Sequence, residues 1–125
     1  MRVLITGAAG QDGTILSTLL ARDGAQVFGL VKPGTPCGRL LDYVPEMQIA
    51  EVDLVDTSSV RELVMDVSPT RLYNFGGFTA PAESWDHADG VRATNVDSVH
   101  VMLEAVSSLN EPARFFQASS SHVFE

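Results

Sequence analysis

Three glycines close to the N-terminus constrain the fold of this chain more than any other feature. They are Gly7, Gly10 and Gly13, and they follow the apolar run Val3-Leu4-Ile5. An amphipathic segment with leucine and isoleucine at helical spacing comes directly after them, over residues 15–20. A strand, a glycine turn and a helix in this order are the context in which such a pattern indicates a dinucleotide-binding site.

Each glycine has its own task in a turn of this kind. Gly7 permits the tight turn, Gly10 lets the backbone approach a pyrophosphate, and Gly13 lets the helix lie close to the strand. The free N–H groups and the positive dipole end of the helix then face the phosphates. The alternative is a glycine turn that holds no ligand.

Strand and helix signals alternate along the rest of the chain. Strands are predicted at about 2–6, 26–31, 47–52, 71–75 and 113–118, and helices at about 12–23, 58–67 and 94–109. Residues 32–38 are rich in Gly and Pro and are predicted to form a loop. The alternation predicts an α/β fold, a Rossmann-type doubly wound parallel sheet of about five strands in the order 3-2-1-4-5, with helices on both faces. Because the chain stops just after the fifth strand, we expect residues 1–125 to be the incomplete, N-terminal part of an NAD(P)-binding domain.

The composition argues against several partners and locations. A formal net charge of -8 argues against nucleic acid or an anionic membrane as the main partner. The single cysteine, Cys37, cannot form an internal disulfide, which indicates a reducing cytoplasm. No apolar run is as long as a membrane helix, and we expect neither a signal peptide nor a metal site.

The end of the second predicted strand bears on the choice between NAD and NADP. NAD-binding proteins usually place an acid there to hold the ribose 2′-hydroxyl, but no acid occurs between Asp23 and Asp42. The ammonium group of Lys32, together with Arg39, would attract a 2′-phosphate. The sequence therefore predicts NADP, with NAD as the alternative cofactor and a solvated loop lysine as the alternative reading of Lys32.

The motif Thr6-Gly7-x-x-Gly10-Gln11-Asp12-Gly13 resembles the GDP-mannose 4,6-dehydratases, a group within the extended short-chain dehydrogenase/reductase family. The resemblance extends over essentially the whole chain and is strongest over 1–20 and 113–124. It implies that Gln11 and Asp12 belong to the cofactor-binding turn.

The same resemblance assigns further residues to the cofactor. Asp53 and Leu54 correspond to an Asp-Leu pair that contacts the adenine, and the alternative is that Asp53 or Asp56 only caps the next helix. At the end of the fourth strand, bare glycines let the backbone pass close to the cofactor ribose and pyrophosphate. The matching residues there are Asn74, Phe75, Gly76 and Gly77.

Asn95 is the last cofactor-binding candidate. It shares one helical stripe with Val99, Met102 and Val106, which predicts that Asn95 is buried in the first turn of the helix. The family has an asparagine or aspartate at the matching place near the active-site backbone. A helix cap or a core amide is the alternative.

Residues 113–124 carry most of the candidate catalytic and substrate-binding groups. By the resemblance, Ser120 is the hydroxyl that hydrogen-bonds the hexose 4-position, and Ser121 and Thr79 lie near the sugar. His122 stands where the dehydratases have the glutamate that removes the proton next to the 4-keto group. Histidine can act as a base near neutral pH, and a histidine without a catalytic task is the alternative.

The resemblance implies a parent enzyme that is an NADP-dependent lyase acting on a nucleotide sugar, with GDP-mannose as the expected substrate. Oxidation at C4, loss of water and reduction at C6 would follow in turn. The alternatives are an epimerase or reductase of the same family, a noncatalytic NAD(P)-sensing protein, and a truncated or split binding module. The chain has no Tyr-x-x-x-Lys pair and no sugar-nucleotide domain, so we expect it to be inactive alone. Relatives of this kind dimerise, so a homo-oligomer is also expected.

Overall fold

The computed structural model describes residues 1–76 and 93–118, with backbone only at 93 and 94. In chain order the elements are β1 (Arg2–Thr6), α1 (Gln11–Arg22), β2 (Gln26–Val31), α2 (Gly38–Tyr43), β3 (Gln48–Glu51), α3 (Thr57–Val67), β4 (Arg71–Asn74), the π-helical turn η1 (Ala93–Asp97), α6 (Ser98–Ser108) and β5 (Arg114–Gln117). The observed strands lie within a residue or two of their predicted bounds, which is the ordinary uncertainty of element ends. None of the described helices has the length and apolar composition needed to cross a bilayer.

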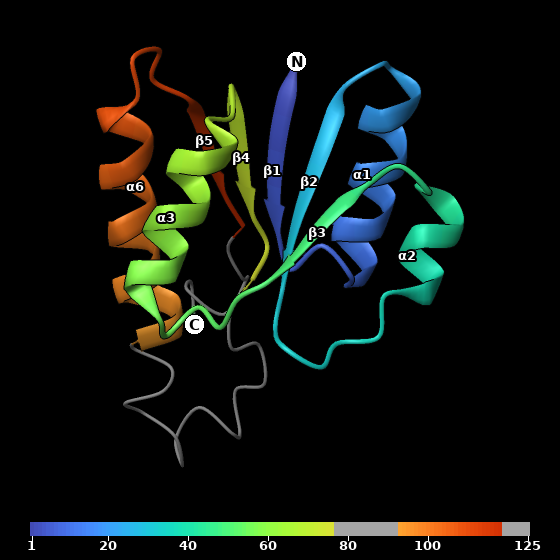
Figure 1. Cartoon of the computed structure of the whole chain (residues 1–125), viewed down its shortest axis with the longest axis horizontal. Coiled ribbons are helices and arrows are strands. Elements are labelled where there is room, and N and C mark those ends of the chain that lie inside the picture. Colours follow the sequence, from blue (N-terminus) through green and yellow to red (C-terminus); the bar gives the residue numbers. More distant parts are fainter. Residues whose placement is uncertain (77–92, 119–125) are drawn as a thin grey trace, which may run out of the picture.

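The strands of the described residues form one parallel sheet in the order β3-β2-β1-β4-β5 (Figure 1). The predicted fold class and strand order are therefore confirmed. The register pairs Thr6 with both Leu30 and Asn74, and Asn74 with Gln117, so these strands end side by side. In open parallel sheets, ligands bind outside the carboxyl ends where the strand order reverses, which here is between β1 and β4.

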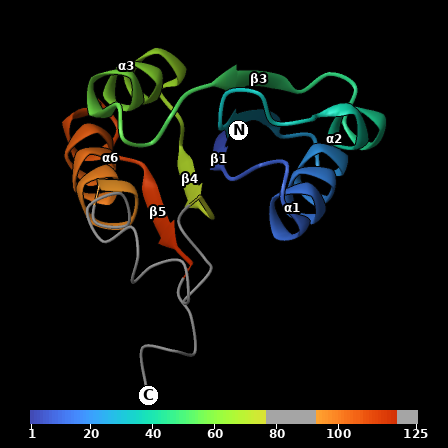
Figure 2. The same cartoon turned by 90° about the horizontal axis from the view of Figure 1, so that it is seen from below.

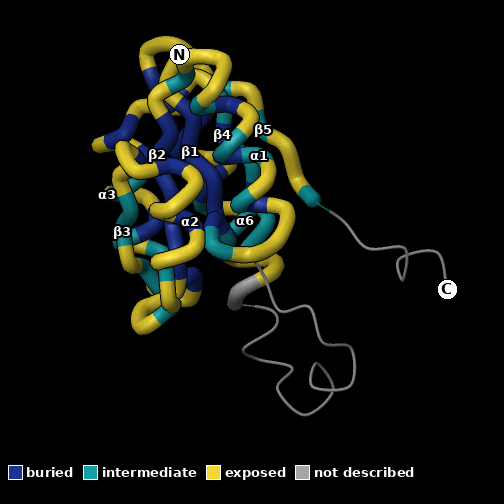
Figure 3. Tube along the Cα trace, turned by 90° about the vertical axis from the view of Figure 1, so that its right-hand side faces the viewer, coloured by how far each residue is buried: buried dark blue, intermediate teal, exposed yellow. Residues whose placement is uncertain are grey.

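The helices cover both faces of this sheet. Helices α1 and α2 lie on one face, and α3 and α6 lie on the other (Figures 1 and 2). Side chains of β1 alternate between two separate cores, because Leu4 packs on the α3 and α6 side whereas Val3 and Ile5 pack on the α1 and α2 side. All three are fully buried, as expected of a central strand covered on both faces. Figure 3 shows the buried residues concentrated along these central strands.

Helix α3 begins at a capped end. The Asp56 carboxylate accepts a hydrogen bond from the Ser59 hydroxyl at 2.7 Å and from the Ser59 backbone N–H at 3.2 Å. These bonds, the side-chain bond first, lower the pKa of Asp56 because they stabilise its ionised form. An exposed ion pair between Arg61 and Glu104, with 2.9 Å between nitrogen and oxygen, ties α3 to α6.

Helix α2 is not predicted by the sequence. It has only six residues, too few for a helical period to be recognised, and its first residue, Gly38, extends the Gly/Pro-rich loop. Its packing depends on Leu40, which is 1% exposed in the core beneath α1 and α2. Tertiary burial, which no local pattern reveals, therefore accounts for this helix.

The predicted helix over 94–109 is divided into η1 and α6. Met102 and Val106 are buried as predicted, but Asn95 is exposed, so its predicted burial is wrong. A π-helical turn contains more residues than an α-helical turn. The buried face of α6, continued towards the N-terminus at 3.6 residues per turn, therefore does not include residue 95.

Candidate functional site

A cavity of about 430 Å³ opens at the carboxyl ends of β1, β2 and β4. It is enclosed by the glycine turn after β1, the end of β2 with its following loop, and the residues after β3 and β4. Its lining residues are Gly7, Ala9, Gly10, Leu30, Val31, Lys32, Thr35, Val52, Asp53, Leu54, Phe75 and Gly76. The cavity therefore lies where this class of sheet binds ligands.

Two of the three glycines are required by packing within the protein. Gly7 has a φ of 63°, and a Cβ atom there would lie 2.8 Å from the Gly76 nitrogen. A Cβ atom at Gly13 would lie 2.4 Å from the Gly7 carbonyl oxygen and 2.7 Å from the Ala8 Cα. The turn after β1 thus contacts the end of β4 on one side and the first turn of α1 on the other.

Gly10 differs from these two, because a Cβ atom there would meet only the Gly7 oxygen, at 3.4 Å. That is an ordinary contact, so packing within the described residues does not require a glycine at this position. Gly10 lines the cavity and is the N-cap of α1, and it provides no side-chain cap. The backbone N–H groups of the first turn of α1 are therefore available to an anion. These features fit the pyrophosphate of a dinucleotide.

The two aspartates after β3 have different tasks. Asp56 caps α3, whereas Asp53 lines the cavity beside Leu54 and accepts a hydrogen bond from the Val55 N–H at 3.2 Å. Leu54 is 8% exposed and offers an apolar surface to the cavity. The capping alternative therefore applies to Asp56 and leaves Asp53 for a ligand.

Only one of the two predicted cations reaches the cavity. Lys32, which is the only lysine in the sequence, is exposed at its lining. Arg39 instead lines an adjoining hollow of about 580 Å³ beside α1 and α2, together with Gln11, and this hollow shares Ala9 and Gly10 with the cavity. Asp12 lines neither space. The structure therefore groups Lys32 with the glycine turn and places Arg39 and Gln11 in the adjoining hollow.

Asn74 lies behind the cavity wall rather than on it. It is 1% exposed, its Oδ1 accepts a hydrogen bond from the Thr6 hydroxyl, and its Nδ2 donates to Gln117 Oε1 at 2.7 Å. The Thr6 hydroxyl also accepts from the Gly76 N–H at 2.9 Å, and Gln117 Nε2 donates to the Ala118 carbonyl at 2.9 Å. This chain of hydrogen bonds joins the ends of β1, β4 and β5 beneath the cavity.

Five lining residues are not predicted from the sequence, namely Ala9, Leu30, Val31, Thr35 and Val52. Leu30 and Val31 end a predicted strand, so the predicted strand order already places them at the ligand-binding edge. Ala9 lies inside the glycine turn. No sequence pattern predicts that Thr35 lines the cavity, because its position depends on the conformation of the loop after β2.

The remaining predicted residues fall into two groups. Gly77, Thr79, Ser120, Ser121 and His122 lie outside the described residues. Asn95 is described and exposed, and it does not line the cavity.

A model of the family described as GDP-mannose 4,6 dehydratase matches residues 4–124. The chain belongs to this family. The GDP-mannose 4,6-dehydratase of Yersinia enterocolitica is 30% identical over 134 residues, which are 98% of this chain and 36% of the relative. The human GDP-mannose 4,6 dehydratase is 32% identical over 97% of this chain and 36% of its own length. The chain thus spans about a third of the length of these relatives.

Solved structures of epimerases share the fold. The UDP-glucose 4-epimerase from Bifidobacterium longum, in complex with NAD+ and UDP, has a TM-score of 0.86 at 22% identity and covers 99% of this chain and 38% of its own. The UDP-Glc/GlcNAc 4-epimerase from Campylobacter jejuni has a TM-score of 0.87 at 16% identity, with the same two coverages. At these identities the likeness establishes only the fold of this chain, which is of the Rossmann type.

Proposed function

We propose that this chain forms the NADP-binding part of a nucleotide-sugar 4,6-dehydratase. The observation that carries the proposal is the cavity in which the glycine turn, Lys32 and Asp53 come together where the strand order reverses. Membership in the GDP-mannose 4,6 dehydratase family supports a nucleotide sugar, and GDP-mannose in particular, as the substrate. A homo-oligomer in the cytoplasm is part of the same proposal.

The residues of the cavity fit the pyrophosphate, the adenine and the 2′-phosphate of NADP. The pyrophosphate would lie against Gly10 and the uncapped first turn of α1. The adenine would lie between the apolar Leu54 and the carboxylate of Asp53, which accepts hydrogen bonds from an amine. Lys32 would face a 2′-phosphate, and β2 ends without an acid, which favours NADP. NAD, which the Bifidobacterium longum epimerase binds, is the alternative.

The chemistry of the sugar would depend on two side chains placed by family position. The bound dinucleotide would supply reversible hydride transfer. The Ser120 hydroxyl would accept a hydrogen bond from the C4 alcohol and donate one to the C4 carbonyl. Neutral His122 would take the proton at C5, which is required for loss of water across C5 and C6.

His122 also favours a second candidate function. An epimerase or reductase does not need a base at residue 122, and the family glutamate is absent from this position.

Neither Tyr43 nor Tyr73 has a lysine four residues later, so the chain contains no Tyr-x-x-x-Lys pair to deprotonate the sugar hydroxyl. We therefore propose that residues 1–125, without any further part of the protein, bind the cofactor but do not turn over a nucleotide sugar.

Titration of the chain with NADPH and with NADH, followed by the fluorescence of the reduced nicotinamide, tests the proposal. We expect both to bind and NADPH to bind more tightly. Equal affinities would overturn the cofactor assignment, and no binding of either would overturn the proposed function. Incubation with GDP-mannose and NADP+ should yield no 4-keto product on chromatography, and sustained product from the pure chain would refute the inactivity.

A further inference from the structure

The segment that presents Lys32 to the cavity is a four-residue turn. The Lys32 carbonyl accepts hydrogen bonds from the Thr35 N–H at 3.0 Å and from the Thr35 hydroxyl at 2.6 Å. Pro33 and Gly34 occupy the central positions, and Gly34 has a φ of 85°. Proline followed by a glycine of positive φ is typical of a type II turn. The first and last residues of the turn both line the cavity.

The turn is anchored by an acid from the neighbouring strand. Glu51 ends β3 and pairs in register with Val31, which ends β2. Its Oε1 accepts a hydrogen bond from the Gly34 N–H at 3.0 Å. The order of the strands therefore brings a carboxylate to this turn, although the sequence from Asp23 to Asp42 has no acid between its ends.

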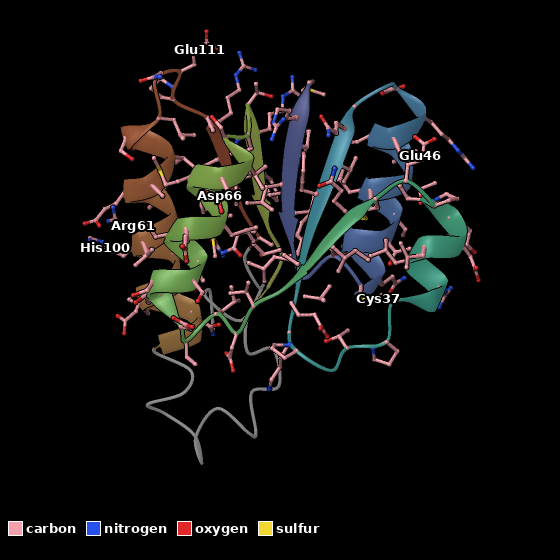
Figure 4. All side chains as sticks on the ribbon, viewed as in Figure 1. Cys37, Glu46, Arg61, Asp66, His100 and Glu111 are labelled. Atoms are coloured by element: carbon pink, nitrogen blue, oxygen red, sulfur yellow. The ribbon has the colours of Figure 1, made fainter. Side chains whose placement is uncertain are left out.

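The same loop is fixed at a second point by a residue that does not line the cavity. The Cys37 thiol donates to the Thr35 carbonyl at 3.3 Å, and Cys37 packs against the core beneath α1 and α2. Figure 4 shows Cys37 where the loop from β2 reaches α2. Thr35 is thus held from the core side, whereas in the described part of the chain the Gly34 N–H is held by the side chain of Glu51.

We propose that Glu51 is a positioning residue that also tunes the preference between NADP and NAD. Its bond to Gly34 keeps Lys32 and Thr35 directed at the cavity. Its negative charge, behind the same turn, opposes the 2′-phosphate that Lys32 attracts. The inference rests on the proposed function for the class of ligand, a nicotinamide dinucleotide.

Two substitutions separate these effects. Glu51→Gln keeps an acceptor oxygen for the Gly34 N–H and removes the charge, whereas Glu51→Ala removes both. Glu111→Gln is the matched control, because Glu111 is an exposed acid at the opposite edge of the sheet (Figure 4). Dissociation constants for NADPH and NADH are measured for all four proteins at low and at high salt.

We expect Glu51→Gln to raise the ratio of NADPH affinity to NADH affinity about threefold at low ionic strength, as for fully solvated charges about 6 Å apart at the dielectric constant of water. The gain should shrink in high salt, because exposed charges are screened. Glu51→Ala should bind NADPH less tightly than Glu51→Gln, since its turn has lost the acceptor. A ratio in Glu51→Gln equal to that in Glu111→Gln overturns the electrostatic effect, and equal NADPH affinities in the two Glu51 variants overturn the positioning effect.

These results are independent of which cofactor the wild-type chain prefers. A protein that prefers NADH refutes the NADP assignment, yet Glu51→Gln must still shift its ratio towards NADPH. NMR spectra give a test without any cofactor. The Gly34 amide resonance should move further from its wild-type position in Glu51→Ala than in Glu51→Gln, because only the alanine variant loses the acceptor. A Gly34 amide resonance that is unchanged in Glu51→Ala overturns the contact itself.

Discussion

The hydroxyl of Thr6, the last residue of β1, donates a hydrogen bond to the side-chain oxygen of Asn74, the last residue of β4. Both residues are 1% exposed, so neither group has water as a substitute partner. The hydroxyl still has lone pairs for the Gly76 N–H, and the amide still has hydrogens for Gln117. Asn74 is predicted to bind the cofactor, and the structure gives it a supporting position behind the cavity, with both of its side-chain polar atoms hydrogen-bonded inside the protein.

Thr6→Val should destabilise the chain by about 1–3 kcal/mol, because it leaves the Asn74 oxygen and the Gly76 N–H without the hydroxyl while keeping the shape of the side chain. Thr6→Ser retains the hydroxyl and should be much less affected. Urea unfolding followed by circular dichroism measures both. If valine and serine variants unfold at the same urea concentration as the wild type, the buried hydrogen bonds contribute nothing to stability.

Substitution by alanine should mainly reduce NADPH affinity at Gly10 and mainly reduce stability at Gly13. Gly13→Ala forces a Cβ atom to within 2.4 Å of a backbone oxygen and should cost about 1–3 kcal/mol or more of stability, as overpacked sites do. Gly10→Ala should cost under about 1 kcal/mol, the price of a poorer helix cap, while it weakens NADPH binding. Urea unfolding and NADPH titration of both variants separate the two effects. If Gly10→Ala binds NADPH as tightly as the wild type, the proposed position of the pyrophosphate at this turn is wrong.

Lys32→Ala should weaken NADPH binding about three- to tenfold and leave NADH binding nearly unchanged, because only NADPH carries a phosphate for the ammonium group. Arg39→Ala is the control, since Arg39 lines the neighbouring hollow and not the cavity. Fluorescence titration with each dinucleotide gives the four affinities. Losses of equal size for NADPH and NADH in Lys32→Ala contradict the 2′-phosphate assignment.

Acid should weaken the cap of α3. The pKa of Asp56 is lowered in the folded chain by the Ser59 hydroxyl and then by the Ser59 N–H. Its contribution to stability is therefore complete above the ordinary pKa of an aspartate, about 4, and is lost as the pH falls through the lower folded pKa. Asp56→Asn keeps an acceptor that does not titrate. Urea unfolding at pH 7 and at pH 3 should show a smaller loss in the asparagine variant, and identical losses would exclude this carboxylate as a source of acid sensitivity.

His122 can be tested in a full-length protein that carries this chain. A histidine base must be neutral, so turnover of GDP-mannose should fall as the pH drops below its pKa. In His122→Glu the acidic limb of the profile should move to lower pH, because a carboxyl group stays ionised there. Gain of dehydration only in the glutamate variant would favour the epimerase or reductase, and binding of NADP without turnover by either protein would favour the sensor.

The parts of the fold and site that the sequence predicts are those with a local cause. The strand before Gly7 and helix α1, which contains Gly13, follow from short-range periodicity and from glycines that their own neighbours require. Lys32 could be placed at the cavity because it directly follows a predicted strand whose end is at the ligand-binding edge.

The misplaced or missed residues depend on structure that is distant in sequence. Glu51 reaches Gly34 only because β2 and β3 are neighbours with a particular register. Arg39 lies on α2, a helix with no periodic signal, and lines the adjoining hollow instead of the cavity. Asn95 leaves its predicted stripe because the backbone widens into a π-helical turn, which no side-chain pattern indicates.

The separation of the core into two halves has a consequence for ligand binding. Of the residues that line the cavity, Leu30 and Leu54 belong to the core under α3 and α6, whereas Val31 and Phe75 belong to or pack against the core under α1 and α2. The two walls of the cavity are therefore supported by independent sets of packed side chains that meet only across the sheet. Truncating Met102 in α6 would leave a void beneath the wall that is proposed to hold the adenine and would leave the packing of the opposite wall unchanged. Cavity-forming substitutions placed in one core at a time would then show how much the packing of each core contributes to dinucleotide affinity.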